Sequence, residues 1–159
     1  MRKVVFPGSF DPITKGHEDL VLRALDLFDE VVVAVGQHSS KKSMFPLDDR
    51  LAMIAHTFAQ ESRVSVASYE GLTADFCLRV GAVAQLRGVR NAVDLSYEQT
   101  IAQMTRTMHP SLDTVVLLTA PAFSAIHSTV VRDVLRHGGD ARPFVPECLS
   151  SRFAPDPSS

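Results

Sequence analysis

The stretch VVFPGSFDPITKGHEDLVLRAL, residues Val4 to Leu25, decides the fold of this chain. An apolar run ends at Pro-Gly, a polar loop follows, and a segment with apolar residues at helical spacing begins near His17. A buried strand that leads through a glycine-containing loop into a helix is the first unit of a parallel α/β fold. Because a helix N-terminus presents free N–H groups and the positive end of its dipole, the same junction is suited to a phosphate group.

The same order of strand and helix recurs along the rest of the chain. Apolar runs rich in β-branched residues occupy residues 3–7, 31–36, 63–68, 82–88 and 113–120. Segments with helical periodicity follow them at residues 17–28, 47–60, 73–81, 96–108 and 128–139. The runs lack polar alternation, as is typical of strands buried on both faces. We therefore predict an α/β fold with a single doubly wound, parallel, five-stranded sheet of the Rossmann-like kind.

In such a sheet ligands bind at the carboxyl ends of the strands, where the strand order reverses. The segments that follow the predicted strands should therefore carry the chemistry. They are GSFDPITKGH (8–17), GQHSSKKSMF (36–45), SYEGLT (68–73), RGVRNAVDLSYE (87–98) and APAFSAIHST (120–129). These segments contain most of the polar and charged residues that are candidates for a binding site, which supports the prediction of a site at this edge of the sheet.

The bulk composition is that of an ordinary globular domain. The chain has 159 residues, 45% of them hydrophobic, and a formal net charge of -2. This length predicts one domain, residues 1–150, while the Pro- and Ser-containing stretch 151–159 is typical of a disordered tail. The lack of an overall basic charge argues against a nucleic-acid polymer as partner, although a local site for a small anion is compatible with it.

Nothing in the sequence indicates a membrane or secretory location. No apolar stretch approaches the roughly 20 residues that cross a bilayer, and the first apolar run ends at Pro7-Gly8, unlike a signal peptide. Cys77 and Cys148 lack CxxC or histidine partner spacing, so we expect two reduced thiols and no zinc site. We therefore expect a cytoplasmic protein.

The first loop is the strongest candidate for a phosphate site. Neither a GxxxxGK[ST] nor a GxGxxG motif occurs, which disfavours a P-loop kinase and a dinucleotide dehydrogenase. Gly8 allows close backbone approach, and Ser9 offers a hydroxyl and an amide. His17 falls in the first turn of the predicted helix, where it could either cap the helix or donate a hydrogen bond to a phosphate. Its place at a helix N-terminus should lower its pKa.

Four motifs together resemble one family. They are PGSFDPITKGH (7–17), SKKSMF (40–45), LRGVRNAVDLSYE (86–98), and HSTVVRDV (127–134) followed by GGD. The chain is similar, from about Val4 to Pro146, to the phosphopantetheine adenylyltransferases, members of the nucleotidyltransferase superfamily with a TxGH or HxGH element. The resemblance implies adenylyl transfer from ATP to 4'-phosphopantetheine, which gives dephospho-coenzyme A and pyrophosphate in coenzyme A biosynthesis.

This reaction explains why no nucleophile or general base stands out. The attacking phosphate monoester is already largely dianionic at pH 7, because its second pKa is about 6. Catalysis should therefore consist of positioning and of donors aimed at the transferred group. Mg²⁺ is expected with ATP, held mostly by phosphate oxygens and water, without a dedicated carboxylate site.

The resemblance also implies roles for individual residues. The catalytic residues would be His17, Lys41 and Arg90. ATP would be bound by Ser9, Phe10, His17, Gly88, Val89, Arg90, Glu98, Phe123, Ile126, His127, Ser128 and Thr129. Phosphopantetheine would be bound by Ser9, Lys41, Leu72, Thr73, Arg87, Ile101 and Met104. Ser128 and Thr129 would provide a second helix N-terminus for the β- and γ-phosphates.

Several alternatives remain open on the sequence alone. Lys42 could replace Lys41, Arg87 and Arg90 could form internal salt bridges, and Met104 could be plain core. Three positions depart from the pattern that is usual in the family. His127 stands in place of serine, DLSYE stands in place of DFEYE, and Thr105 stands in place of asparagine. A homohexamer and feedback inhibition by coenzyme A are implied by the resemblance only.

The alternative functions differ in class. The STVVR stretch also resembles nicotinate-mononucleotide adenylyltransferases, but the TKGH motif has Thr14 where that family has histidine, and that family lacks RGVR…SYE. Cytidylyltransferases are further away, because their first loop is usually LLHxGH. A regulator that binds nucleotide without catalysis is disfavoured, because binding alone does not require donors at the transferred phosphate.

Overall fold

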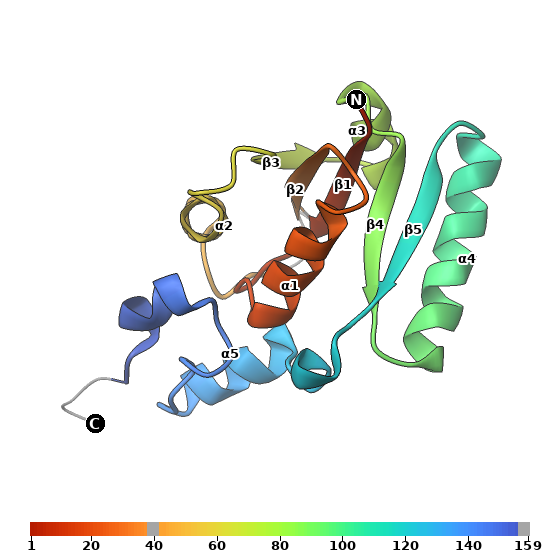
Figure 1. The fold of residues 1–159 in the computed structure, drawn as a ribbon. Helices are drawn as coiled ribbons and strands as arrows, with labels where there is room; N and C mark the ends of the chain where they lie inside the picture. Colours follow the sequence, from red (N-terminus) through yellow and green to blue (C-terminus); the bar gives the residue numbers. More distant parts are fainter. Residues whose placement is uncertain (38–41, 156–159) are drawn as a thin grey trace.

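The computed structural model describes residues 1–37 and 42–155 and confirms the predicted parallel sheet (Figure 1). The strands are β1 (Lys3–Gly8), β2 (Glu30–Gln37), β3 (Val64–Glu70), β4 (Ala84–Val89) and β5 (Asp113–Leu118). The helices are α1 (Lys15–Ala24), α2 (Leu47–Thr57), α3 (Thr73–Arg79), α4 (Ala92–Met108), η1 (Pro121–Phe123), α5 (Ser128–Arg136) and η2 (Glu147–Phe153). The strand order is β3-β2-β1-β4-β5 and every pairing is parallel, so the order reverses at β1.

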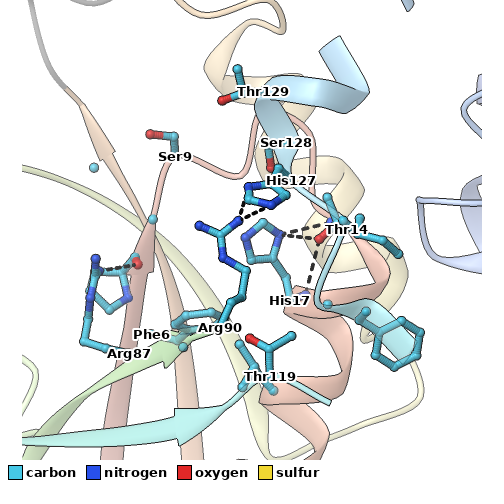
Figure 2. Close-up of a pocket in the computed structure, with 18 of the residues that line it drawn as sticks. Phe6, Ser9, Thr14, His17, Arg87, Arg90, Thr119, His127, Ser128 and Thr129 are labelled. Carbon is cyan, nitrogen blue, oxygen red and sulfur yellow. Dashed lines mark hydrogen bonds between the residues drawn. The ribbon is translucent and has the colours of Figure 1, made fainter. Parts of the chain in front are cut away.

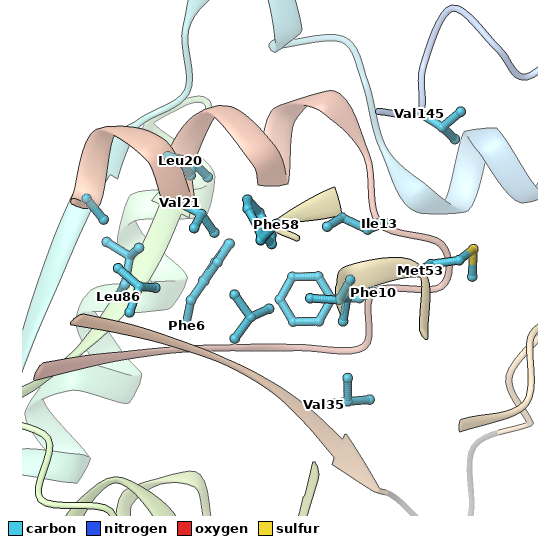
Figure 3. Close-up of a cluster of buried hydrophobic side chains, with 14 of the residues drawn as sticks. Phe6, Phe10, Ile13, Leu20, Val21, Val35, Met53, Phe58, Leu86 and Val145 are labelled. Carbon is cyan, nitrogen blue, oxygen red and sulfur yellow. The ribbon is translucent and has the colours of Figure 1, made fainter. Parts of the chain in front are cut away.

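The alternation of side chains along each strand builds a core on both faces of the sheet. Val4 and Phe6 of β1 belong to a core cluster that includes side chains of α1, α2, α5 and η2. Figure 3 shows Phe6 next to Leu20 and Val21 of α1. Val5, between them, points to the other face and packs with α3. Both faces are therefore covered by helices, which explains why the strands are apolar without alternation.

The sheet opens between β1 and β4, at the point where the strand order reverses. The β1–β2 pairing extends from Lys3 to Gly8, whereas the β1–β4 pairing is limited to Val4 and Val5. Pro7 has no N–H to donate, so β1 offers one donor fewer at this end of the strand, although its pairing with β2 continues to Gly8. The carboxyl ends of β1 and β4 thus leave room for a ligand, as expected for a doubly wound sheet.

The C-terminal segment is more ordered than the sequence suggests. The predicted boundary at residue 150 falls inside η2, and the Phe153 side chain is only 4% exposed. Phe153 packs edge-to-face on Phe45, and Arg152 forms an ion pair with Asp49 at 2.8 Å. Residues 151–153 therefore belong to the domain, because an aromatic side chain in the core outweighs the local Pro and Ser content.

Helix α4 begins earlier than its periodicity predicts. Its first residue is Ala92, and the Asn91 side chain caps it by accepting a hydrogen bond from the Asp94 N–H at 2.9 Å. Half of the predicted loop 87–98 is therefore helical. Among the described residues, no helix is both long and apolar enough to cross a membrane.

Candidate active site

A cavity of about 600 Å³ lies at the carboxyl ends of β1 and β4 (Figure 2). It brings together eleven of the predicted site residues. These are Ser9, Thr73, His17, Arg87, Gly88, Arg90, Phe123, Ile126, His127, Ser128 and Thr129. Its volume is within the range of sites for small molecules. The cavity is therefore the candidate active site.

His17 lies at the third position of α1 and is held by a reciprocal cap. The Thr14 main-chain N–H donates to Nδ1 of His17 over 3.0 Å, and the His17 N–H donates to the Thr14 hydroxyl over 3.4 Å. A backbone N–H can only donate, so Nδ1 carries no proton and the proton of the neutral ring is on Nε2. The cap thus fixes the tautomer and leaves Nε2–H as the donor. The two sequence alternatives, cap and phosphate donor, are compatible in one residue.

The ring of His17 is neutral at physiological pH. Burial and, second, the positive charge of Arg90 lower the pKa of His17 from 6.5 to about 4. From the sequence, the helix N-terminus is the expected cause of a lowered His17 pKa. In the structure, the largest cause is the loss of solvation on burial. Phe10 contributes to this environment, because its ring meets the His17 ring edge-on at 4.9 Å. A neutral Nε2–H donor next to developing negative charge needs no proton transfer.

The two helix N-termini at the cavity differ in how many N–H groups they leave free. At α1, the Lys15 N–H donates to Phe144 and the His17 N–H donates to Thr14, which leaves Gly16. At α5, the first three N–H groups make no hydrogen bond to any residue that the structure describes. The N-terminus of α5 is therefore the better anion site.

Arg87, at the end of β4, is held by an ion pair and still lines the cavity. Its Nε and Nη2 both donate to the Glu98 carboxylate over 2.7 Å, and Nη1 donates to the Pro7 carbonyl over 3.2 Å. The salt-bridge alternative is thus realised. Three of the five guanidinium N–H groups are used, so two are left for a ligand. The Glu98 side chain is buried against Arg87 and does not line the cavity.

Arg90 reaches across the mouth of the cavity. Its Nε donates to Asp94 over 2.9 Å, and its Nη1 contacts both ring nitrogens of His127. The salt-bridge alternative holds here too, and Arg90 remains exposed at the cavity wall. A sequence-predicted triphosphate site is therefore flanked by a guanidinium and an imidazole that touch each other.

The structure places several predicted site residues away from the cavity. Phe10 has a positive φ of 45°, which turns its ring into the core, where it is 2% exposed. Val89 is 1% exposed, and its carbonyl accepts the Thr119 N–H. Leu72 and Met104 are exposed outside the cavity lining, and Ile101 of α4 does not line it either. Lys41 lies outside the described residues.

Sequence reasoning missed the residues that hold the site together. The Asp11 carboxylate accepts the Met44 and Phe45 N–H groups, each over 2.9 Å. Arg132 of α5 donates to the Asp11 carbonyl over 2.9 Å. These contacts join the loop after β1 to two distant segments. Their only sequence signal is the position of Asp11 in the GSFDP motif.

Further contacts secure the same loop, and Phe6, Tyr69 and Tyr97, which are not among the predicted site residues, line the cavity. The Arg50 side chain donates to the Ser9 carbonyl over 2.8 Å, and the Ser128 hydroxyl donates to the Pro12 carbonyl over 3.0 Å. The Tyr97 side chain is mostly exposed and lines the cavity.

The described residues do not form a metal site of their own. Within residues 1–37 and 42–155, no group of three or more His, Cys, Asp or Glu side chains could hold a metal ion. The donors that face the cavity are cationic or neutral N–H and O–H groups, which suit anionic oxygens rather than a cation.

Comparison with known proteins identifies the family. The model of the cytidylyltransferase-like family matches residues 5–134. A phosphopantetheine adenylyltransferase of Flavobacterium psychrophilum is 50% identical over 149 residues, which cover 94% of this chain and 98% of the relative. The enzymes of that name from Christiangramia forsetii and Thiobacillus denitrificans are 48% and 42% identical, over 96% and 97% of this chain and 100% and 96% of their own lengths.

Solved structures agree on the fold. A bifunctional NMN adenylyltransferase/ADP ribose pyrophosphatase from Francisella tularensis superposes with a TM-score of 0.72 at 15% identity, over 94% of this chain and 45% of that one. A lipopolysaccharide core biosynthesis protein from Thermoplasma volcanium gives a TM-score of 0.57 at 22% identity, over 76% of this chain and 98% of that one. The chain belongs to the cytidylyltransferase-like family and, within it, to the phosphopantetheine adenylyltransferases.

Proposed function

We propose that this protein transfers the adenylyl group of ATP to 4'-phosphopantetheine, giving dephospho-coenzyme A and pyrophosphate. The observation that carries the proposal is that one cavity is lined by His17, Arg87, Arg90 and the free N-terminus of α5. Two anionic substrates repel each other, so a site for both must surround them with donors. The identity to the named relatives over nearly the whole chain supports the choice of substrates.

The chemical step requires no covalent intermediate on the protein. A phosphate oxygen of phosphopantetheine attacks the α-phosphorus of ATP, a new P–O bond forms, and the bond to the bridging oxygen breaks. Pyrophosphate leaves with that oxygen and its electron pair. We assign to Nε2–H of His17 a hydrogen bond to an α-phosphate oxygen, which strengthens as negative charge builds up there.

The remaining donors position the two substrates. We assign Arg87 to the phosphate of phosphopantetheine and Arg90 with the α5 amides to the β- and γ-phosphates. Ser9 lies on the cavity wall between these groups. Lys41 stays a prediction for the attacking phosphate. Mg²⁺ enters as part of the nucleotide substrate and would be held by phosphate oxygens and water.

A substrate comparison tests the proposal. The protein is incubated with ATP and Mg²⁺ together with either 4'-phosphopantetheine or nicotinate mononucleotide, and pyrophosphate and dephospho-coenzyme A are quantified. We expect pyrophosphate to be released in the reaction with phosphopantetheine and not in the reaction with nicotinate mononucleotide, in a 1:1 ratio to dephospho-coenzyme A. Pyrophosphate release only with nicotinate mononucleotide would replace this function with that of the alternative family.

Assembly, regulation and location belong to the same proposal. A homohexamer is supported by apolar side chains exposed on α4 and β5, among them Val93, Tyr97 and Leu118. Light scattering after size-exclusion chromatography tests the mass. Feedback inhibition by coenzyme A is tested by adding it to the assay. A cytoplasmic location is supported by two free cysteines, Cys77 and Cys148.

A further inference from the structure

His127 occupies a position in the cavity wall where its ring is free to meet a ligand. It is the N-cap residue of α5, but its side chain makes no capping hydrogen bond. The ring lines the cavity, and both of its nitrogens contact Arg90 Nη1 (Figure 2). The imidazole therefore lies between a guanidinium and the free N–H groups of α5, the anion site described above.

The partner of His127 determines its protonation state in the free protein. Nη1 of Arg90 contacts both ring nitrogens. A guanidinium only donates hydrogen bonds, so the ring nitrogen that accepts from it carries no proton, and such a ring is neutral. Partial burial and the charge of Arg90 lower the pKa of His127, and the Asp94 carboxylate opposes them. His17, another titratable group of the cavity wall, is itself neutral, and Arg132 contributes a further positive charge beside Thr129. With the cavity free of anions, protonated His127 would place two cations in contact.

A triphosphate reverses this balance. Its oxygens at the α5 N-terminus would lie against both Arg90 and His127, and they accept hydrogen bonds only. A neutral ring can offer them one N–H, whereas a protonated ring carries a positive charge and a donor on each nitrogen. We propose, on the basis of the function proposed above, that His127 takes up a proton when the nucleoside triphosphate binds and becomes, with Arg90, a second cation on the triphosphate.

The consequence is a proton linkage that serine at this position would lack. A bound anion raises the pKa of His127 above its value in the free protein, so binding takes up a proton between the two pKa values. Affinity for the triphosphate therefore rises as pH falls through that window, by at most about tenfold per pH unit for one proton. Below the lower pKa the effect is complete.

Calorimetry measures this proton directly. α,β-Methylene-ATP with Mg²⁺, which cannot transfer its adenylyl group, is titrated into the protein at pH 7 in buffers of different ionisation enthalpy. The slope of observed enthalpy against ionisation enthalpy gives the protons taken up. We expect His127→Ser to reduce this slope, and to flatten the dependence of Kd on pH between 8 and 6. His137→Ser, a control at the exposed far end of α5, should leave both as in the wild type.

The outcomes of the titrations distinguish the proton uptake by His127 from the proposed function of the protein. Equal slopes in the wild type and His127→Ser, with the analogue bound to both, would overturn the proton uptake and leave the proposed function intact. No binding of the analogue to the wild type would overturn both. Should His127→Ser unfold, as judged by circular dichroism, His127→Asn replaces it, because it keeps a polar planar group that does not titrate in this range.

Discussion

At the scale of single residues, the site depends on how His17 divides its two ring nitrogens. Nδ1 is used by the fold, because it accepts the Thr14 N–H at the start of α1. Nε2–H is left for chemistry. This division can be tested, because an asparagine oxygen can approximate the acceptor at Nδ1 but offers no donor at the position of Nε2.

Replacing His17 with asparagine should therefore impair catalysis more than folding. We expect kcat to fall by about 10²-fold or more with little change in KM for either substrate, as for the loss of one transition-state donor. Steady-state kinetics and thermal unfolding are measured together. His56→Asn, on the exposed side of α2, serves as the matched control with unchanged kcat. A raised KM with normal kcat would make His17 a binding residue.

The neutral state of His17 also makes folding stability depend on pH. The pKa is about 4 in the folded protein against 6.5 as its ordinary value. The unfolded chain therefore binds more protons between these values, and stability is lost as pH falls below about 6.5. The free energy of unfolding should drop by roughly 2 kcal/mol from this residue by pH 5. Urea titrations at pH 7 and 5 should show a smaller drop in His17→Asn; an identical drop would contradict the assignment.

Residue roles were predictable where a motif sets them and not where backbone geometry does. His17 is indicated by the TKGH motif, and the structure places it in the lining of the cavity. Phe10 is next to Ser9 in the same motif, yet its positive φ sends the ring into the core. Side-chain direction at such a turn depends on the conformation of single residues, which a sequence pattern does not encode.

At the scale of elements, the ion pair between β4 and α4 determines how Arg87 is presented. Glu98 receives both Nε and Nη2 of Arg87 from one face. The pairing is partly shielded, with side-chain exposures of 28% and 10%. It therefore restrains the guanidinium more firmly than an exposed salt bridge would.

Replacing Glu98 with glutamine should loosen Arg87 without removing it. We expect KM for phosphopantetheine to rise by several-fold to about tenfold, because the guanidinium is less well oriented for the phosphate. KM for ATP should change less. A rise confined to KM for ATP would instead support the sequence-based role of Glu98 at the ATP ribose. Initial rates with each substrate varied in turn separate the two.

The element boundaries show a similar division between predictable and unpredictable features. All five strands were predictable, because buried parallel strands are continuous apolar runs. The start of α4 was missed by periodicity, although Asn91 three residues before Asp94 is a capping signal. Periodicity alone therefore did not indicate this end of the helix.

At the scale of the whole molecule, the sheet reversal and the C-terminal segment together define the domain. The doubly wound topology, and the site at its switch point, follow from the alternation of strands and helices. The contribution of η2 does not, because its core contacts come from two isolated apolar side chains, Leu149 and Phe153, in an otherwise polar and Pro-containing segment. Contacts made at long range leave no local pattern.

Two truncations test whether η2 belongs to the domain. Deleting residues 151–159 removes Phe153 and should destabilise the protein by about 3 kcal/mol or more, as for loss of a buried aromatic side chain. Deleting only residues 155–159 should have little effect. Chemical denaturation of both forms and of the full chain compares them. Equal stability of all three would mean that the chain after residue 150 is dispensable, as the sequence suggests.

The central claim is that one cavity holds the triphosphate of ATP and the phosphate of phosphopantetheine, with neutral His17 directed at the α-phosphate of the transferred adenylyl group. A crystal structure with α,β-methylene-ATP, Mg²⁺ and phosphopantetheine bound tests it most directly. We predict that Nε2 of His17 lies within about 3.2 Å of an α-phosphate oxygen. The phosphate of phosphopantetheine should bind Arg87, and the β- and γ-phosphates of the nucleotide should bind the N-terminus of α5. A triphosphate bound outside this cavity, or one whose α-phosphate lies beyond the reach of His17, would contradict the account.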